Sequence, residues 1–135
     1  ESRFEEKIAS YVNKHGWDSF REEEQLLAEE LSEYDQAIID CGGGIVTREV
    51  NIQNLKKNGF VVWLQASPEK IALRIGYDKN RPSLTGTKSH TDEIIDVLNE
   101  RTPLYQNAAN FVVSTDDHSI EECADLIINK WERIQ

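Results

Sequence analysis

The sequence contains few cysteines and no long apolar segment, and these two absences limit the kinds of protein it can encode. Only Cys41 and Cys123 occur among the 135 residues, and no Cys/His spacing typical of a zinc site is present. We therefore expect reduced thiols and a cytoplasmic location. No apolar run approaches the roughly 20 residues that span a bilayer, so no membrane partner is expected.

Positive charge is also scarce. The chain has 15 Lys and Arg against 25 Asp and Glu, which gives a formal net charge of −10. This balance argues against nucleic acid and anionic membranes as main partners. It does not exclude a small anionic substrate, because a few arginines can form a positive pocket on an acidic protein. A hydrophobic content of 39% is typical of a globular chain, and this length suits one domain.

Short apolar runs alternate with amphipathic segments along the chain. Strands are predicted for the apolar runs 37–39, 60–64 and 111–114. Helices are predicted for residues 4–12, 18–32, 49–57, 67–76, 91–101 and 119–131. Pro103 is expected to break the helix at 91–101 before it resumes, and Ser119 with Glu122 forms a predicted capping box. The alternation predicts an α/β fold with a parallel sheet flanked by helices.

The stretch from Gln36 to Arg48 is the first candidate for a functional site. Its apolar run ends in Asp40, and three glycines follow at 42–44. Consecutive glycines let a ligand approach the backbone closely, and ligands of α/β proteins bind beyond the carboxyl ends of strands. Two interpretations stay open: a site for a small polar ligand, with or without a metal ion, or a tight turn in which Thr47 caps the next helix.

Glu24 lies on the apolar face of the predicted helix 18–32, three residues after Arg21. A carboxylate that faces inward needs a partner, so we expect an ion pair with Arg21. The alternative is a surface ion pair worth less than about 1 kcal/mol.

Residues 77–90 are polar and show no periodicity, which is typical of a functional lid in a domain of this size. The segment carries Lys79, Arg81 and Lys88, so it could bring positive charge over an anion. The alternative is an ordinary solvated loop.

Four motifs in order resemble those of the shikimate kinase family, and the resemblance covers residues 1–135. The segment 16–24 resembles the G-x-x-x-F-R-x-x-E helix of the family, and 40–44 resembles its glycine triplet. Arg74 together with 81–84 resembles the adenine-contacting arginine and the start of the lid. The segment 100–105 resembles the E-R-x-P-L-Y signature.

The resemblance implies a three-layer α/β/α fold of the P-loop kinase type and a kinase reaction. The reaction is transfer of the γ-phosphoryl group of ATP, with Mg²⁺, to the 3-hydroxyl of shikimate, in the biosynthesis of chorismate and the aromatic amino acids. It also implies four regions: shikimate-binding helices (1–33), a core (34–76), a lid (77–90), and the last helices and strand (91–135).

The resemblance assigns the substrate-binding residues. Arg21 and Arg101 would hold the carboxylate of shikimate, because a guanidinium matches a carboxylate in a fork-like geometry. Glu24 would hold Arg21 in place. Backbone groups of the glycine triplet would contact the ring hydroxyls; the triplet consists of Gly42, Gly43 and Gly44.

The resemblance also assigns residues to ATP and magnesium. Arg81 would be the catalytic residue, stabilising charge on the transferring phosphoryl group, and Arg74 would lie against the adenine. Asp40 departs from the Ser, Thr or Ala usual in the family and is interpreted as a magnesium ligand acting through water, with a purely structural role as the alternative. Trp17 is another departure, since many bacterial members have Glu there.

The phosphate-binding motif G-x-x-x-x-G-K-[ST] of the family does not occur among these 135 residues. We therefore expect the carboxyl-terminal part of a longer kinase domain, inactive by itself, with unpaired apolar strand edges at 37–41 and 60–64. The alternative is a non-catalytic binding or regulatory module that has lost the loop. Fusion to or association with another enzyme of the pathway, and a monomer or weak dimer, stay open.

Overall fold

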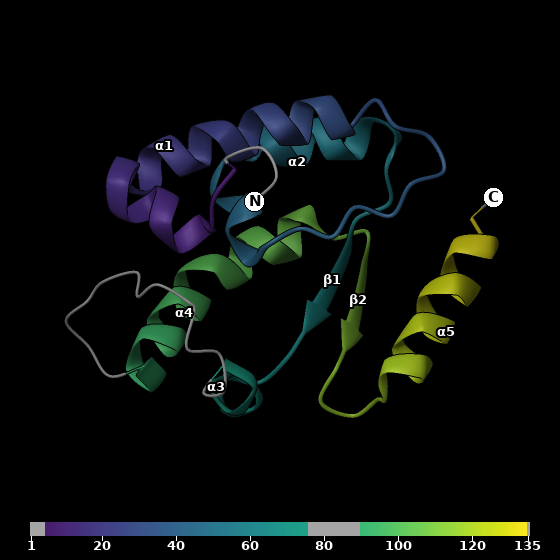
Figure 1. Ribbon diagram of the computed structural model, residues 1–135. Coiled ribbons are helices and arrows are strands. Elements are labelled where there is room, and N and C mark those ends of the chain that lie inside the picture. Colours follow the sequence, from purple (N-terminus) through teal and green to yellow (C-terminus); the bar gives the residue numbers. More distant parts are fainter. Residues whose placement is uncertain (1–4, 76–89, 135) are drawn as a thin grey trace. The chain divides into compact units, whose positions relative to one another are not determined.

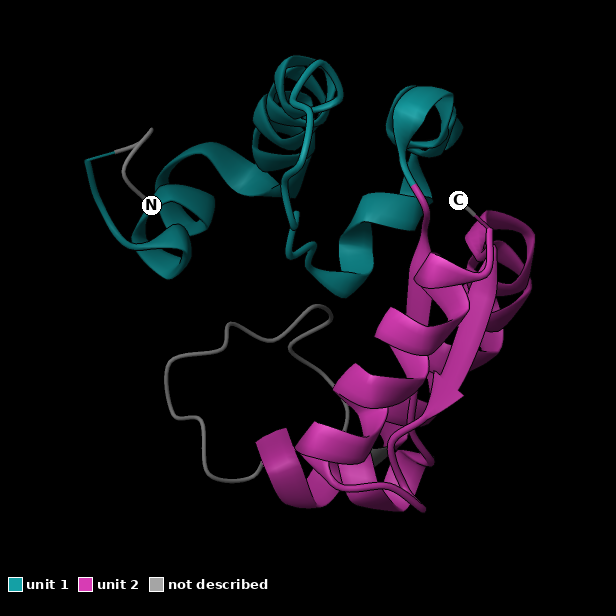
Figure 2. Ribbon diagram, turned by 90° about the vertical axis from the view of Figure 1, so that its right-hand side faces the viewer, with its two compact units in different colours: residues 1–59, 79–82 teal, residues 60–78, 83–135 magenta. Residues whose placement is uncertain are grey.

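The computed structural model describes residues 5–75 and 90–134 (Figure 1). Its elements in chain order are α1 (Ile8–Leu31), the 3₁₀ helix η1 (Gly43–Thr47), α2 (Glu49–Asn58), β1 (Val62–Gln65), α3 (Pro68–Ile75), α4 (His90–Ala108), β2 (Phe111–Ser114) and α5 (Ile120–Glu132). They form two compact units, the first with α1, η1 and α2 and the second with the rest (Figure 2). Residues 77–89 of the predicted lid, with Arg81, and Phe4 of the first predicted helix lie outside the described residues, while His90, the last residue of the predicted lid, begins α4.

The first unit is built on α1, whose two halves meet at Gly16. Gly16 has φ 83° and ψ 167°, and the chain is helical on both sides of it. A positive φ is tolerated best by glycine, so the sequence correctly predicts two helical segments that meet here. α1 packs against α2 and η1, and their buried side chains include Val12, Ala28 and Val46.

The second unit is a three-layer arrangement around a parallel pair of strands. β1 and β2 pair in register, with Val62 opposite Phe111. α4 packs on one face, where Tyr105 stacks on Trp63 at 5.4 Å between ring centroids, and α5 packs on the other, where Lys130 lies over the Phe111 ring at 5.8 Å (Figure 1). The predicted α/β fold with a parallel sheet flanked by helices is thereby confirmed.

The strand predicted at 37–39 is wrong: this segment is not a strand in the structure. The segment lies outside the sheet, and the Ile38 side chain is fully exposed, at 102% of its reference area. An extended segment becomes a strand only when a neighbour supplies backbone hydrogen bonds. Among the described residues only β1 and β2 form a sheet, so this apolar run has no strand to pair with.

Two further local predictions are corrected. Thr47 does not cap α2; Arg48 occupies the N-cap position, and the Thr47 hydroxyl instead donates to the carbonyl of Gly44 at 2.7 Å. Pro103 does not break α4, which is helical from His90 to Ala108. Proline removes one backbone donor from the helix, but the hydrogen bonds around it and the packing of Tyr105 on Trp63 hold the remaining turns together.

The capping box predicted for α5 is confirmed and gives a first stability prediction. The Ser119 hydroxyl accepts from the Glu122 amide at 3.2 Å, and the Glu122 carboxylate accepts from the Ser119 amide at 2.7 Å. Ser119→Ala should lower the free energy of unfolding by about 1 kcal/mol, because an amide at the helix start loses its acceptor. Ser119→Asp keeps an acceptor and should stay near wild type. Urea unfolding measures both, and an unchanged alanine variant would contradict the assignment.

Candidate functional site

The second half of α1 carries a partly buried ion pair. Arg21 Nη1 donates to Glu24 Oε2 at 2.6 Å, and the two side chains are only 16% and 15% exposed. The spacing of three residues places both groups on one side of the helix. The predicted pair is therefore confirmed, and its burial rules out the surface-pair alternative.

Gly44 lies directly against the guanidinium of Arg21. A Cβ atom built on Gly44 would overlap the Arg21 Nη1, Nη2 and Cζ atoms, so no larger residue fits while Arg21 keeps this position. A Cβ atom built on Gly42 would meet nothing within 4 Å. The Arg21 guanidinium thus lies against Gly44 at one end of the triplet, and the space beside Gly42 at the other end is open.

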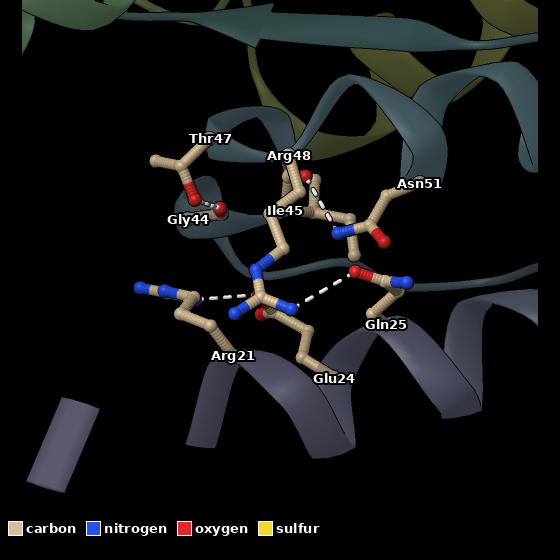
Figure 3. Close-up of polar contacts among 8 residues, drawn as sticks. All are labelled: Arg21, Glu24, Gln25, Gly44, Ile45, Thr47, Arg48 and Asn51. Carbon is tan, nitrogen blue, oxygen red and sulfur yellow. Dashed lines mark hydrogen bonds and ion pairs between the residues drawn. The ribbon is translucent and has the colours of Figure 1, made fainter. Parts of the chain in front are cut away.

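Hydrogen bonds hold the turn that follows the glycines (Figure 3). The Thr47 hydroxyl donates to the Gly44 carbonyl, and the Ile45 amide donates to the Gly42 carbonyl at 3.1 Å. Asn51 of α2 is completely buried, and its Nδ2 donates to the Ile45 carbonyl at 3.0 Å. Side chains of η1 and α2 thus hold the glycine backbone in one conformation beside Arg21.

Arg48 connects η1 and α2 to α1. Its Nη1 donates to Gln25 Oε1 at 2.9 Å, next along the helix from Glu24 (Figure 3). Neither Arg48, Gln25 nor Asn51 is predicted from sequence as a site residue. Arg48 and Gln25 are 23 residues apart, so no local pattern reveals their contact. The position of Asn51 shortly after the three glycines is the one sequence signal for it, because an amide side chain there can bond the backbone of the turn.

The Arg21–Glu24 pair gives a second stability prediction. Glu24→Ala removes the carboxylate and leaves the largely buried guanidinium without its ionic partner, so the free energy of unfolding should fall by about 1–2 kcal/mol. Glu29→Ala removes an exposed carboxylate from the same helix and should change it by less than about 0.5 kcal/mol. Urea unfolding of both variants measures the difference, and equal stabilities would show that the pair contributes no more than a surface contact.

Asp40 is exposed, just before the glycine triplet. Its neighbour Cys41 is exposed, but neighbouring atoms still partly desolvate the thiol and raise its pKa, with smaller contributions from the negative charges of Asp40 and Glu24. The thiol therefore stays protonated at neutral pH. Within the part of the chain that the structure describes, no three His, Cys, Asp or Glu side chains are grouped to hold a metal ion. The assignment of Asp40 to magnesium stays a prediction.

Arg74 and Arg101 belong to the second unit. Arg74 donates to the Thr115 hydroxyl at 2.8 Å and to the Thr115 carbonyl at 3.0 Å, so two contacts fix its guanidinium beyond the end of β2. Hydrogen bonding with Ser67 holds the pKa of the adjacent Asp116 carboxyl below its usual range, and the charges of Arg74 and Lys70 act in the same direction. Arg101 is half-buried in α4.

The structure thus brings together three predicted residues, Arg21, Glu24 and Gly44, within the first unit. The roles predicted for Arg74, Arg81 and Arg101 stay predictions. Over residues 5–75 and 90–134, no helix has the length and apolar character needed to cross a membrane.

Comparisons with known proteins agree with the motifs. The family model described as shikimate kinase matches residues 1–132. A shikimate kinase of Dehalococcoides mccartyi is 36% identical over 128 residues, which cover 93% of this chain and 72% of that protein.

Solved structures give the same result for the fold. A shikimate kinase from Acinetobacter baumannii in complex with shikimate matches with a TM-score of 0.84 and 28% identity, over 99% of this chain and 73% of that one. A shikimate kinase from Bacteroides thetaiotaomicron matches with a TM-score of 0.81 and 25% identity, over 99% of this chain and 78% of that one. With the helix motif, the glycine triplet and the family model in agreement, the chain belongs to the shikimate kinase family.

Proposed function

We propose that the protein transfers the γ-phosphoryl group of ATP to the 3-hydroxyl of shikimate, and that Arg21 holds the carboxylate of the substrate. One observation supports this above the others. The Arg21 guanidinium is paired with Glu24 at 2.6 Å, seated on Gly44, and 16% exposed at the side-chain level. A cation fixed in this way beside an open glycine backbone suits a small anionic substrate with several hydroxyl groups.

Shikimate has one carboxylate and three hydroxyls, which suit the groups present. Glu24 accepts from Nη1 of Arg21, and the guanidinium has further N–H donors for the substrate carboxylate. Arg101 would supply a second cation for the same carboxylate. The space beside Gly42 would let a ring hydroxyl reach its backbone, because a Cβ atom built there meets nothing within 4 Å. The backbone of Gly43 would contact a neighbouring hydroxyl.

The nucleotide would be bound by residues of other segments. The guanidinium of Arg74, held at two points by Thr115, offers a fixed plane on which the adenine could lie. Arg81 would stabilise charge on the transferring phosphoryl group. Asp40 presents an exposed carboxylate next to the glycine triplet, which fits a magnesium ion that keeps most of its water ligands. Bound there with ATP, the ion would neutralise phosphate charge.

The same proposal covers location and partners. We place the protein in the cytoplasm, with shikimate, ATP and Mg²⁺ as its ligands. A fused or associated enzyme of the same pathway, and a monomer or weak dimer, are compatible with it.

An assay of the intact protein tests the proposed reaction. With ATP and Mg²⁺, release of ADP should depend on shikimate, and ³¹P NMR should show a phosphate ester at the 3-position. Shikimate binding without ADP release would favour the non-catalytic alternative. The absence of both shikimate binding and ADP release would contradict the proposal.

A further inference from the structure

Two aromatic rings lie beside the guanidinium of Arg21. The Cζ atom of Arg21 is 5.3 Å from the centre of the Trp17 ring and 5.3 Å from the centre of the Phe20 ring. The two rings meet edge to face, with centroids 5.8 Å apart and planes at 86°. The two rings are thus nearly perpendicular, and the guanidinium lies within cation–π distance of both.

Arg21 is held by a hydrogen bond to a carboxylate as well as by the two rings. A guanidinium donates hydrogen bonds only within its plane, from its edges, and its faces carry no donors. Glu24 occupies one edge, at 2.6 Å from Nη1. The two rings attract the cation in addition to this hydrogen bond. A guanidinium has five N–H donors, so Arg21 can be held by Glu24, Trp17 and Phe20 and still donate to an anion.

The local sequence explains why Trp17 reaches Arg21. Trp17 follows Gly16, where the helix is interrupted, and starts the second helical segment of α1. Arg21 is four residues later, so both side chains lie on one side of that segment. Trp17 is only partly exposed, which strengthens the attraction between ring and cation because water competes less.

We propose that Trp17 is a positioning residue that holds the Arg21 guanidinium in its carboxylate-binding orientation before the substrate arrives. The inference rests on the proposed function in one respect, that the anion is shikimate. It predicts an effect of Trp17 on substrate binding and not on the phosphoryl-transfer step, because the ring acts only through Arg21.

Substitutions in the intact protein test this. Trp17→Leu keeps an apolar cover but has no π face, and it should raise the KM for shikimate about five- to thirty-fold while kcat changes less than about twofold. Trp17→Phe restores a ring and should recover most of the loss. Trp131→Leu removes an exposed tryptophan of α5 that contacts Phe60, and it should leave KM unchanged.

A double-mutant cycle separates positioning from simple packing. In an Arg21→Ala background, Trp17→Leu should have no further effect on shikimate binding, because the group it positions is absent. If Trp17→Leu weakened shikimate binding by the same factor with and without Arg21, the proposal would be overturned. An unchanged KM for Trp17→Leu alone would also overturn it.

NMR of the Arg21 Nε–H group gives a readout that needs no substrate. The Trp17→Leu substitution should shift this resonance, through loss of the ring current, and speed its hydrogen exchange, while Trp131→Leu should do neither. An unchanged resonance and exchange rate would overturn the positioning role even if shikimate is phosphorylated. A changed resonance in a protein without activity on shikimate would uphold the role and reject the proposed function.

Discussion

Replacing Arg21 by alanine should weaken shikimate binding by about 100-fold in the intact protein. The substitution removes a guanidinium that the carboxylate of the substrate would contact, and truncating one member of a desolvated, hydrogen-bonded charge pair costs about 2–5 kcal/mol. Glu24, which is only 15% exposed when Arg21 is present, would also be left as an unpaired carboxylate that repels the substrate anion. Isothermal titration with shikimate measures the change in Kd.

Two further variants show whether the loss of shikimate binding comes specifically from removing the Arg21 guanidinium. Arg133→Ala removes the same charge from the exposed end of α5 and should leave the Kd unchanged. Arg21→Lys keeps the charge but lacks the planar fork, so it should recover only part of the affinity. An Arg21→Ala variant that binds shikimate as wild type would mean that the carboxylate is held elsewhere.

Gly44→Ala is expected to reduce shikimate binding strongly while lowering the free energy of unfolding by no more than Glu24→Ala does. The new Cβ atom would overlap the Arg21 guanidinium, which is the end of a flexible side chain. That side chain can move aside without a shift of the backbone, at the cost of its contact with Glu24. Once displaced, Arg21 loses its orientation toward the substrate, so we expect a Kd about ten- to a hundred-fold higher. Titration and urea unfolding of the same sample give both quantities.

Gly59→Ala is the matched control, with the opposite pattern. A Cβ atom at Gly59 would overlap the backbone carbonyl oxygen of Leu55, which cannot move without disturbing the end of α2. This variant should lose stability and keep its affinity for shikimate. If Gly44→Ala bound shikimate with wild-type affinity and lost only stability, the contact of Gly44 with Arg21 would have no role in substrate binding.

Much of this fold follows from local patterns. The break at Gly16 and the capping box at Ser119 each depend on a few neighbouring residues, and each is present as predicted. The Arg21–Glu24 pair follows from helical spacing for the same reason. Where the controlling interaction is local, the sequence is sufficient. The apolar run at Phe111–Ser114 also forms its predicted strand, because β1 is there to pair with it.

The strand that does not form at 37–39 and the contacts that were not predicted involve distant partners, whereas the errors at Thr47 and Pro103 are local. The apolar run at 37–39 has the composition of a strand, but pairing decides its conformation, and the described residues offer it no neighbour. Contacts such as Arg48 with Gln25 depend on how η1 and α2 pack on α1, which no short window of sequence reports. The cation–π contact of Trp17 with Arg21 joins residues at the spacing of one helical turn. Spacing alone, however, does not distinguish a ring that positions the arginine from one that only covers apolar surface.

A crystal structure of the intact protein with shikimate would test the central claim most directly. The claim is that Arg21, paired with Glu24 and seated on Gly44, receives the substrate carboxylate. We expect the carboxylate oxygens about 3 Å from the Arg21 guanidinium nitrogens, with ring hydroxyls facing the backbone of the glycine triplet. Shikimate bound with its carboxylate away from Arg21 would contradict the account.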